Sequence, residues 1–183
     1  MACKQAWCEI MNVGKKFERD FQKSVPDYAL IYRIPDPAQS FGRNNNLRFS
    51  KKNPFDFLMW DSNGRTLFAL ELKTVAGKSI SFEREKGENK DIHLYQIDGL
   101  TEWSKYRGII AGFVISFRSM DKTIFLRIED FNKLAEIIEK KSFTIQDLDD
   151  NDIKYFVIPQ ELLRVRYRYD VDNFIQNILK DGM

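Results

Sequence analysis

The segment from Asn53 to Thr74 constrains the fold most, because it has the pattern of two β-strands joined by a turn. Apolar side chains occupy every second position from Phe55 to Met59, which is the period of a strand with one buried face. Asn63 and Gly64 follow, and this dipeptide predicts a two-residue hairpin loop with a positive φ. Thr66 to Thr74 is the expected return strand. The chain is therefore predicted to contain an antiparallel hairpin.

Polar side chains on this hairpin suggest a chemical site. Glu71 and Lys73 are two residues apart, so a strand directs them to the same face. Antiparallel pairing can bring Asp56 beside them. Two carboxylates with a backbone carbonyl, here that of Leu72, form an oxygen site suited to Mg²⁺. The alternative is a solvated Glu-x-Lys ion pair, which is common on strands, although an acid within the apolar strand of Asp56 needs a partner or a function.

Length and composition bound the class of protein. The chain has 183 residues, which fits one domain over residues 1–183. Its formal net charge is only +2, so any nucleic-acid surface must be local. The sequence has neither the apolar core of a signal peptide nor a run long enough to span a membrane, so a cytoplasmic protein without membrane or nucleotide-cofactor partners is expected.

The remaining apolar periodicity predicts helices and strands in a mixed order. Phe17 and Phe21 mark the buried face of the first helix, with Glu18 at its side. Gln96 lies beside the apolar face of a later helix, for which Asp91 is the expected N-cap. The expected helices are 14–23, 91–106, 129–140 and 171–179, and the further expected strands are 28–34, 108–117, 123–128, 155–158 and 164–169. This order predicts an α/β fold with a mixed central β-sheet flanked by helices.

Two segments are rich in cations. The connection from Pro35 to Asn53 has no acid after Asp36, and a long basic loop of this kind suits a phosphate backbone. Alternating arginines near the C-terminus predict a strand with one basic face; a solvated edge strand is the alternative. The residues expected to contact DNA are Lys15, Lys16, Arg43, Arg48, Lys51, Lys52, Arg164, Arg166 and Arg168.

Asp56 followed by Glu71, Leu72 and Lys73 resembles the motif of the PD-(D/E)xK nuclease superfamily. Three segments narrow the resemblance to the RecU family of Holliday-junction resolvases: residues 12–18 (NVGKKFE), 71–74 (ELKT) and 93–97 (HLYQI). Val13 stands where that family has arginine, and Tyr95 where it has a second histidine. The resemblance covers about residues 12–130.

The resemblance implies a restriction-endonuclease-like core and a metal-dependent endonuclease that resolves four-way DNA junctions by paired symmetric nicks with 5′-phosphate ends. It implies Mg²⁺, with Mn²⁺ as an alternative, held by Asp56, Glu71, Leu72 and Glu18. It further implies catalysis by Lys73 and Gln96 and a short DNA-binding stalk at about residues 36–52. The pattern of residues itself, beyond the resemblance, predicts the strand and helix over 159–180.

Several alternatives remain open on the sequence. Glu18 could instead pair on the surface with Lys15 or Gln22. The protein could be another PD-(D/E)xK nuclease acting on ends, nicks or duplex, or an inactive junction-binding protein. Symmetric resolution requires two active sites, so a homodimer is expected. The small size suits a compact genome such as that of a phage.

Overall fold

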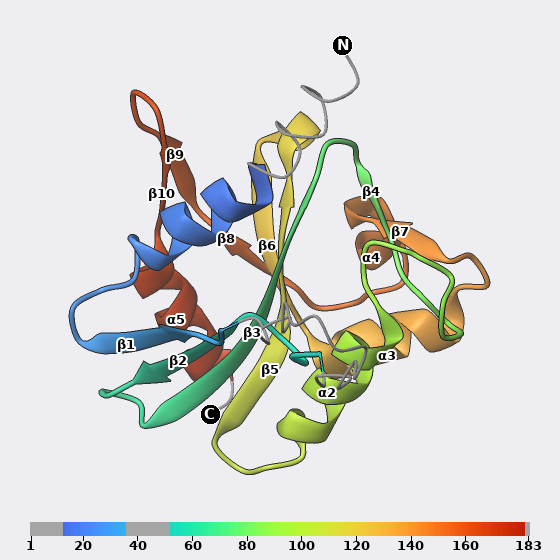
Figure 1. Cartoon of the computed structure of the whole chain (residues 1–183), viewed down its shortest axis with the longest axis horizontal. Coiled ribbons are helices and arrows are strands. Elements are labelled where there is room, and N and C mark those ends of the chain that lie inside the picture. Colours follow the sequence, from blue (N-terminus) through green and yellow to red (C-terminus); the bar gives the residue numbers. More distant parts are fainter. Residues whose placement is uncertain (1–12, 36–51, 182–183) are drawn as a thin grey trace, which may run out of the picture.

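A six-stranded mixed sheet forms the centre of the computed structural model, which describes residues 13–35 and 52–181 (Figure 1). Its strands, in spatial order, are β1 (Ala29–Arg33), β2 (Phe57–Asp61), β3 (Thr66–Val75), β5 (Ile109–Phe117), β6 (Lys122–Arg127) and β8 (Phe156–Ile158). Neighbours pair antiparallel except β3 and β5, which are parallel. A 3₁₀ turn, η1 (Arg118–Met120), connects β5 to β6.

The predicted hairpin is β2 and β3, but its turn differs from the prediction. Asp61 pairs with Thr66, so the loop has four residues, and the positive φ belongs to Arg65 instead of Gly64. Asp61 is fully buried, and its carboxylate accepts hydrogen bonds from the N–H groups of Asn63 and Gly64, at 3.1 and 2.6 Å. The expected two-residue loop is wrong because this Asp side chain stabilises a wider turn.

Helices cover both faces of the sheet (Figure 1). Along β5 the side chains alternate, so that Phe113 packs in one core and Val114 in the other. The first core includes α2 (Leu94–Ser104) and α3 (Ile128–Ile137), and the second includes helical residues 13–22 and α5 (Val171–Asp181). The predicted fold class, an α/β protein with a mixed central sheet flanked by helices, is confirmed.

Two short ribbons lie outside the main sheet. One joins β4 (Ser79–Ser81) to β7 (Ser142–Thr144), ahead of α4 (Ile145–Asp150). The other joins β9 (Gln160–Leu162) to β10 (Tyr167–Tyr169) and projects from the body in Figure 1.

The predicted strand of three arginines on one face is wrong. Strand β10 contains only Arg168, whereas Arg164 and Arg166 lie in the turn that joins β9 to β10. The Leu163 N–H donates to the Arg166 carbonyl at 2.8 Å, which closes this turn.

The helix boundaries correct two further predictions. Helix α2 begins after His93, not Asp91, because the Asp91 carboxylate accepts hydrogen bonds from Ser81 instead. Helix α3 ends at Ile137, which is 56% exposed, and so does not continue to residue 140 as expected. None of the helices within residues 13–35 and 52–181 combines the length and apolar character needed to cross a membrane.

Gly112 tests the packing of the sheet where β5 and β6 meet. A Cβ at this position would lie 2.3 Å from the Leu126 carbonyl oxygen. Gly112→Ala is therefore expected to lower the free energy of unfolding by about 1 to 3 kcal/mol, measured by urea denaturation. Gly77→Ala is the matched control, since nothing lies within 4 Å of its Cβ and little change is expected. Equal effects at both positions would contradict this packing.

Candidate active site

Glu71 and Lys73 form the centre of a polar cluster on β3. The Lys73 Nζ lies 3.1 Å from the Glu71 Oε1, so the strand directs both side chains to one face as expected. Glu71 is almost completely buried and Lys73 is mostly so, with side-chain exposures of 4% and 18%. This burial separates them from the solvated Glu-x-Lys pairs that are common on strands.

Asp56 joins this pair from the residue just before β2. Its N–H donates to the Leu70 carbonyl at 3.1 Å, which continues the pairing of β2 with β3 by one step. Its Oδ2 in turn accepts the Leu72 N–H at 3.0 Å. The carboxyl is thereby held against β3, where its charge contributes to raising the pKa of Glu71.

Gln96 reaches the cluster from the first turn of α2. Its side-chain Nε2 donates to the Glu71 Oε1, and its Oε1 accepts the His93 N–H at 3.0 Å. Both ends of the buried amide are thus fixed by the protein. Gln96 therefore contacts one of the two carboxylates directly.

Glu18 lies near the cluster but is engaged by a cation. The Arg33 Nε donates to its Oε2 at 2.9 Å, so neither Lys15 nor Gln22 is the partner that the sequence suggested. The Glu18 charge nevertheless contributes to raising the pKa of both Asp56 and Glu71. Arg33 was missed because nothing in the spacing of β1 indicates where its side chain points.

The electrostatics of the cluster suit a divalent cation. Burial raises the pKa of Glu71 from 4.5 to about 8, against the opposing effect of Lys73 and with a further rise from Asp56. Burial also raises the pKa of Asp56. Two buried carboxylates whose ionised forms are disfavoured are the donors that an added cation would stabilise.

The predicted third carboxylate does not complete a cluster. Within the described part of the chain, no three His, Cys, Asp or Glu side chains come together closely enough to hold a metal by themselves. Glu18 forms its ion pair with Arg33 instead. A cation here would depend on Asp56 and Glu71, with backbone and water oxygens.

An open pocket of about 1220 Å³ adjoins the cluster. Its lining includes Lys52, Pro54, Lys86, His93, Tyr95 and Trp103. The negative charges of Glu71 and Asp56 contribute to a raised pKa of Tyr95, after burial, which places this wall of the pocket beside the carboxylates. Lys52 Nζ lies 4.9 Å from the centre of the Tyr95 ring, so this predicted DNA contact is close to the site.

The other predicted DNA contacts are scattered. Lys15 is exposed on the helix of residues 13–22, next to the half-buried Lys16. Arg164 and Arg166 are exposed at the end of the β9–β10 ribbon, whereas Arg168 pairs with Glu161 at 2.6 Å. Arg43, Arg48 and Lys51, with most of the expected stalk, lie outside the described residues.

Sequence comparison finds one curated relative. The chain is 36% identical over 132 residues to the SPbeta prophage-derived uncharacterized protein YotM of Bacillus subtilis (strain 168). The match covers 71% of this chain, and the chain spans 63% of the length of that relative, less than two thirds. No protein-family model matches the chain.

Structural comparison finds the Holliday junction resolvase Hjc of Archaeoglobus fulgidus. The two structures superpose with a TM-score of 0.44 at 17% sequence identity. The match covers 73% of this chain and 90% of the resolvase.

Proposed function

We propose that this protein is a metal-dependent DNA endonuclease of the PD-(D/E)xK type that resolves four-way junctions. The observation that carries the proposal is the convergence of Asp56, Glu71 and Lys73, all largely buried, on one face at the end of the β2–β3 hairpin. A buried acid pair beside a lysine is costly for folding, and chemistry at this site would explain why it is retained.

Asp56 and Glu71 would hold the cation, Mg²⁺ or Mn²⁺, with the Leu72 carbonyl as a further oxygen and Glu18 at the edge of the site. When bound, such an ion stabilises charge on a phosphate and makes a bound water more acidic. Glu71 lies against Lys73 and Gln96, so its orientation is fixed before DNA arrives. This fixed position reduces the reorganisation needed for the reaction.

Lys73 is the proposed activator of the attacking water. Its ammonium forms an ion pair with Glu71, and from this position it can orient the water or balance the charge of a phosphate. Gln96 holds Glu71 through one N–H and has a second N–H for the water or a phosphate oxygen. These roles require no movement of β3 or α2.

DNA would approach across the open pocket beside Tyr95. Lys52 lies at this pocket, and Arg164 and Arg166 are exposed at the tip of a projecting ribbon. Cations in these positions suit a phosphate backbone. Paired nicks require a homodimer with two such sites, and the prophage relative fits a phage-type resolvase within the RecU family.

The test compares three labelled DNAs with the protein and Mg²⁺: a four-way junction, the matching duplex and the same duplex with a nick. Paired symmetric nicks in the junction alone are the expected result. Equal cutting of all three would leave a nuclease of this type but remove the preference for junctions. Binding of the junction with no cutting under Mg²⁺ or Mn²⁺ would identify a binding protein.

A further inference from the structure

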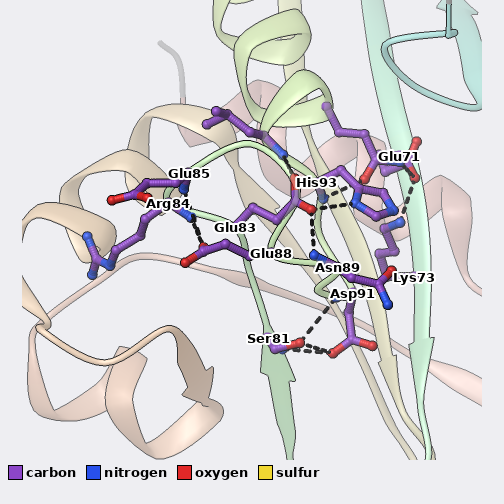
Figure 2. Close-up of polar contacts among 12 residues, drawn as sticks. Glu71, Lys73, Ser81, Glu83, Arg84, Glu85, Glu88, Asn89, Asp91 and His93 are labelled. Carbon is purple, nitrogen blue, oxygen red and sulfur yellow. Dashed lines mark hydrogen bonds and ion pairs between the residues drawn. The ribbon is translucent and has the colours of Figure 1, made fainter.

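Glu83 is a buried acid that lies outside the catalytic cluster, with a side chain only 6% exposed. Three groups surround its carboxylate. The Asn89 N–H and the His93 Nδ1 are 3.0 and 3.1 Å from Oε1 (Figure 2). The Leu94 N–H donates to Oε2 at 2.9 Å. The Leu94 N–H, then His93, lowers the pKa of Glu83. The carboxylate is therefore held as an anion at one place.

That place is the N-terminus of α2. The first turn of α2 contains no acidic residue, and the Gln96 side chain accepts the N–H of the N-cap residue His93. The first backbone N–H groups of a helix lack partners within it, and an anion there is favourable. Glu83, ten residues before His93, fills this role from a neighbouring segment. Backbone bonds fix that segment, since the Glu83 N–H donates to the Ile92 carbonyl at 2.9 Å.

The same turn of α2 carries Gln96 to the active site. The His93 N–H that the Gln96 Oε1 accepts lies one residue before Leu94, whose N–H Glu83 accepts. The other end of the Gln96 amide donates to Glu71. A continuous set of hydrogen bonds therefore runs from Glu83 through the start of α2 to Glu71.

We infer that Glu83 is a positioning residue for the active site, which fixes the first turn of α2 so that Gln96 holds Glu71 in place. The effect of Glu83 on DNA cleavage rests on the proposed endonuclease function. The effect of Glu83 on the position of Gln96 does not. Glu83 does not reach the reacting atoms and acts only through Gln96.

Glu83→Gln is a discriminating variant. The carboxylate accepts backbone N–H groups on two different oxygens, Asn89 on one and Leu94 on the other. A glutamine side chain has one acceptor oxygen, so one of these N–H groups must face an NH₂ group in either orientation. The size of the side chain is unchanged, so the variant tests the hydrogen bonds and not the packing.

Asp91→Asn is the matched control. Asp91 lies on the same segment and bonds to Ser81 through its carboxylate, at 2.9 Å to the N–H and 2.6 Å to the hydroxyl (Figure 2). It does not cap α2. Both variants replace a carboxylate by an amide on the segment before α2. Only Glu83→Gln disturbs the hydrogen bonds that lead to Gln96.

The first measurement is steady-state cleavage of the junction. Glu83→Gln is expected to lower kcat by about 10- to 100-fold with KM for DNA within about twofold of wild type, because a misplaced catalytic group costs rate and not DNA affinity. Asp91→Asn is expected to cleave as wild type does. A wild-type kcat for Glu83→Gln would overturn the inference.

The second measurement needs no activity. Hydrogen exchange at the Gln96 side-chain amide, followed by NMR and assigned with Gln96→Ala, is expected to quicken by about tenfold in Glu83→Gln and not in Asp91→Asn. An unchanged rate would overturn the inference even if the wild type cuts no DNA, in which case the proposed function fails separately. If Glu83→Gln does not fold, Glu83→Asp replaces it. Its side chain is one methylene shorter, so its carboxylate is drawn back from the Asn89 and Leu94 N–H groups and the same quickened exchange is expected. A wild-type exchange rate there would also overturn the inference.

Discussion

Asp56→Asn is expected to lower the rate of junction cleavage by about 1,000-fold or more while leaving junction binding within about twofold. The substitution keeps the shape of the side chain and an oxygen that can accept the Leu72 N–H. It removes one of the two buried negative charges on which a divalent cation would depend. Single-turnover cleavage and a gel-shift titration on the same junction measure the two quantities.

Asp61→Asn is the matched control at the opposite end of the same strand. Asp61 is buried and accepts two backbone N–H groups in the hairpin turn, so its loss should lower stability. It lies away from the polar cluster of Asp56, Glu71 and Lys73 and should leave the single-turnover rate unchanged. If the two variants lose cleavage equally, the rate reflects the integrity of the hairpin and not a role for Asp56.

Glu71→Gln is expected to abolish cleavage and, without metal, to stabilise the protein. At pH values above about 8 the gain in the free energy of unfolding should be about 1 to 3 kcal/mol. The wild-type carboxylate is then ionised within the protein, where burial disfavours its charge. Glutamine has no charge and keeps an oxygen that Gln96 and Lys73 can reach.

The pH dependence has a definite sign. The pKa of Glu71 is about 8 in the folded chain and 4.5 as its ordinary value, so the folded state binds more protons between these limits. The Glu71 contribution to stability is therefore complete below pH 4.5 and is lost as the pH rises to about 8. The advantage of Glu71→Gln should grow over the same interval.

Urea denaturation across this pH range, in the presence of a chelator, measures the effect. Mg²⁺ should then stabilise the wild type and not the variant, because a ligand stabilises only the state that binds it. A stability difference that is independent of pH would contradict the raised pKa of Glu71.

The sequence was sufficient to predict that Asp56, Glu71 and Lys73 lie together at the centre of the polar cluster. The two-residue period of a strand places Glu71 and Lys73 on one face, and antiparallel pairing brings Asp56 beside them. The spacing of α2 also placed Gln96 beside its apolar face. These are local relations along one strand, one hairpin and one helix, so the sequence determines them without knowledge of the packing.

Relations between distant segments were not predictable in the same way. The ion pair of Glu18 with Arg33 depends on how the first helix lies against β1. The cap of α2 by Glu83 depends on a loop in which Gly87 and Asn89 have positive φ, at 93° and 54°. The Asp-stabilised hairpin turn was missed because Asn63-Gly64 is the stronger local signal for a two-residue loop.

The most direct test of the central claim is cleavage of the four-way junction by the wild-type protein with Mg²⁺ and with a chelator in its place. The account predicts paired nicks with 5′-phosphate ends in Mg²⁺, and an intact junction that is still bound in the chelator. Cutting that continues at the same rate in the chelator would contradict the assignment of Asp56 and Glu71 as ligands of a catalytic metal. A junction that is bound but never cut, with Mg²⁺ or Mn²⁺, would contradict the enzyme itself.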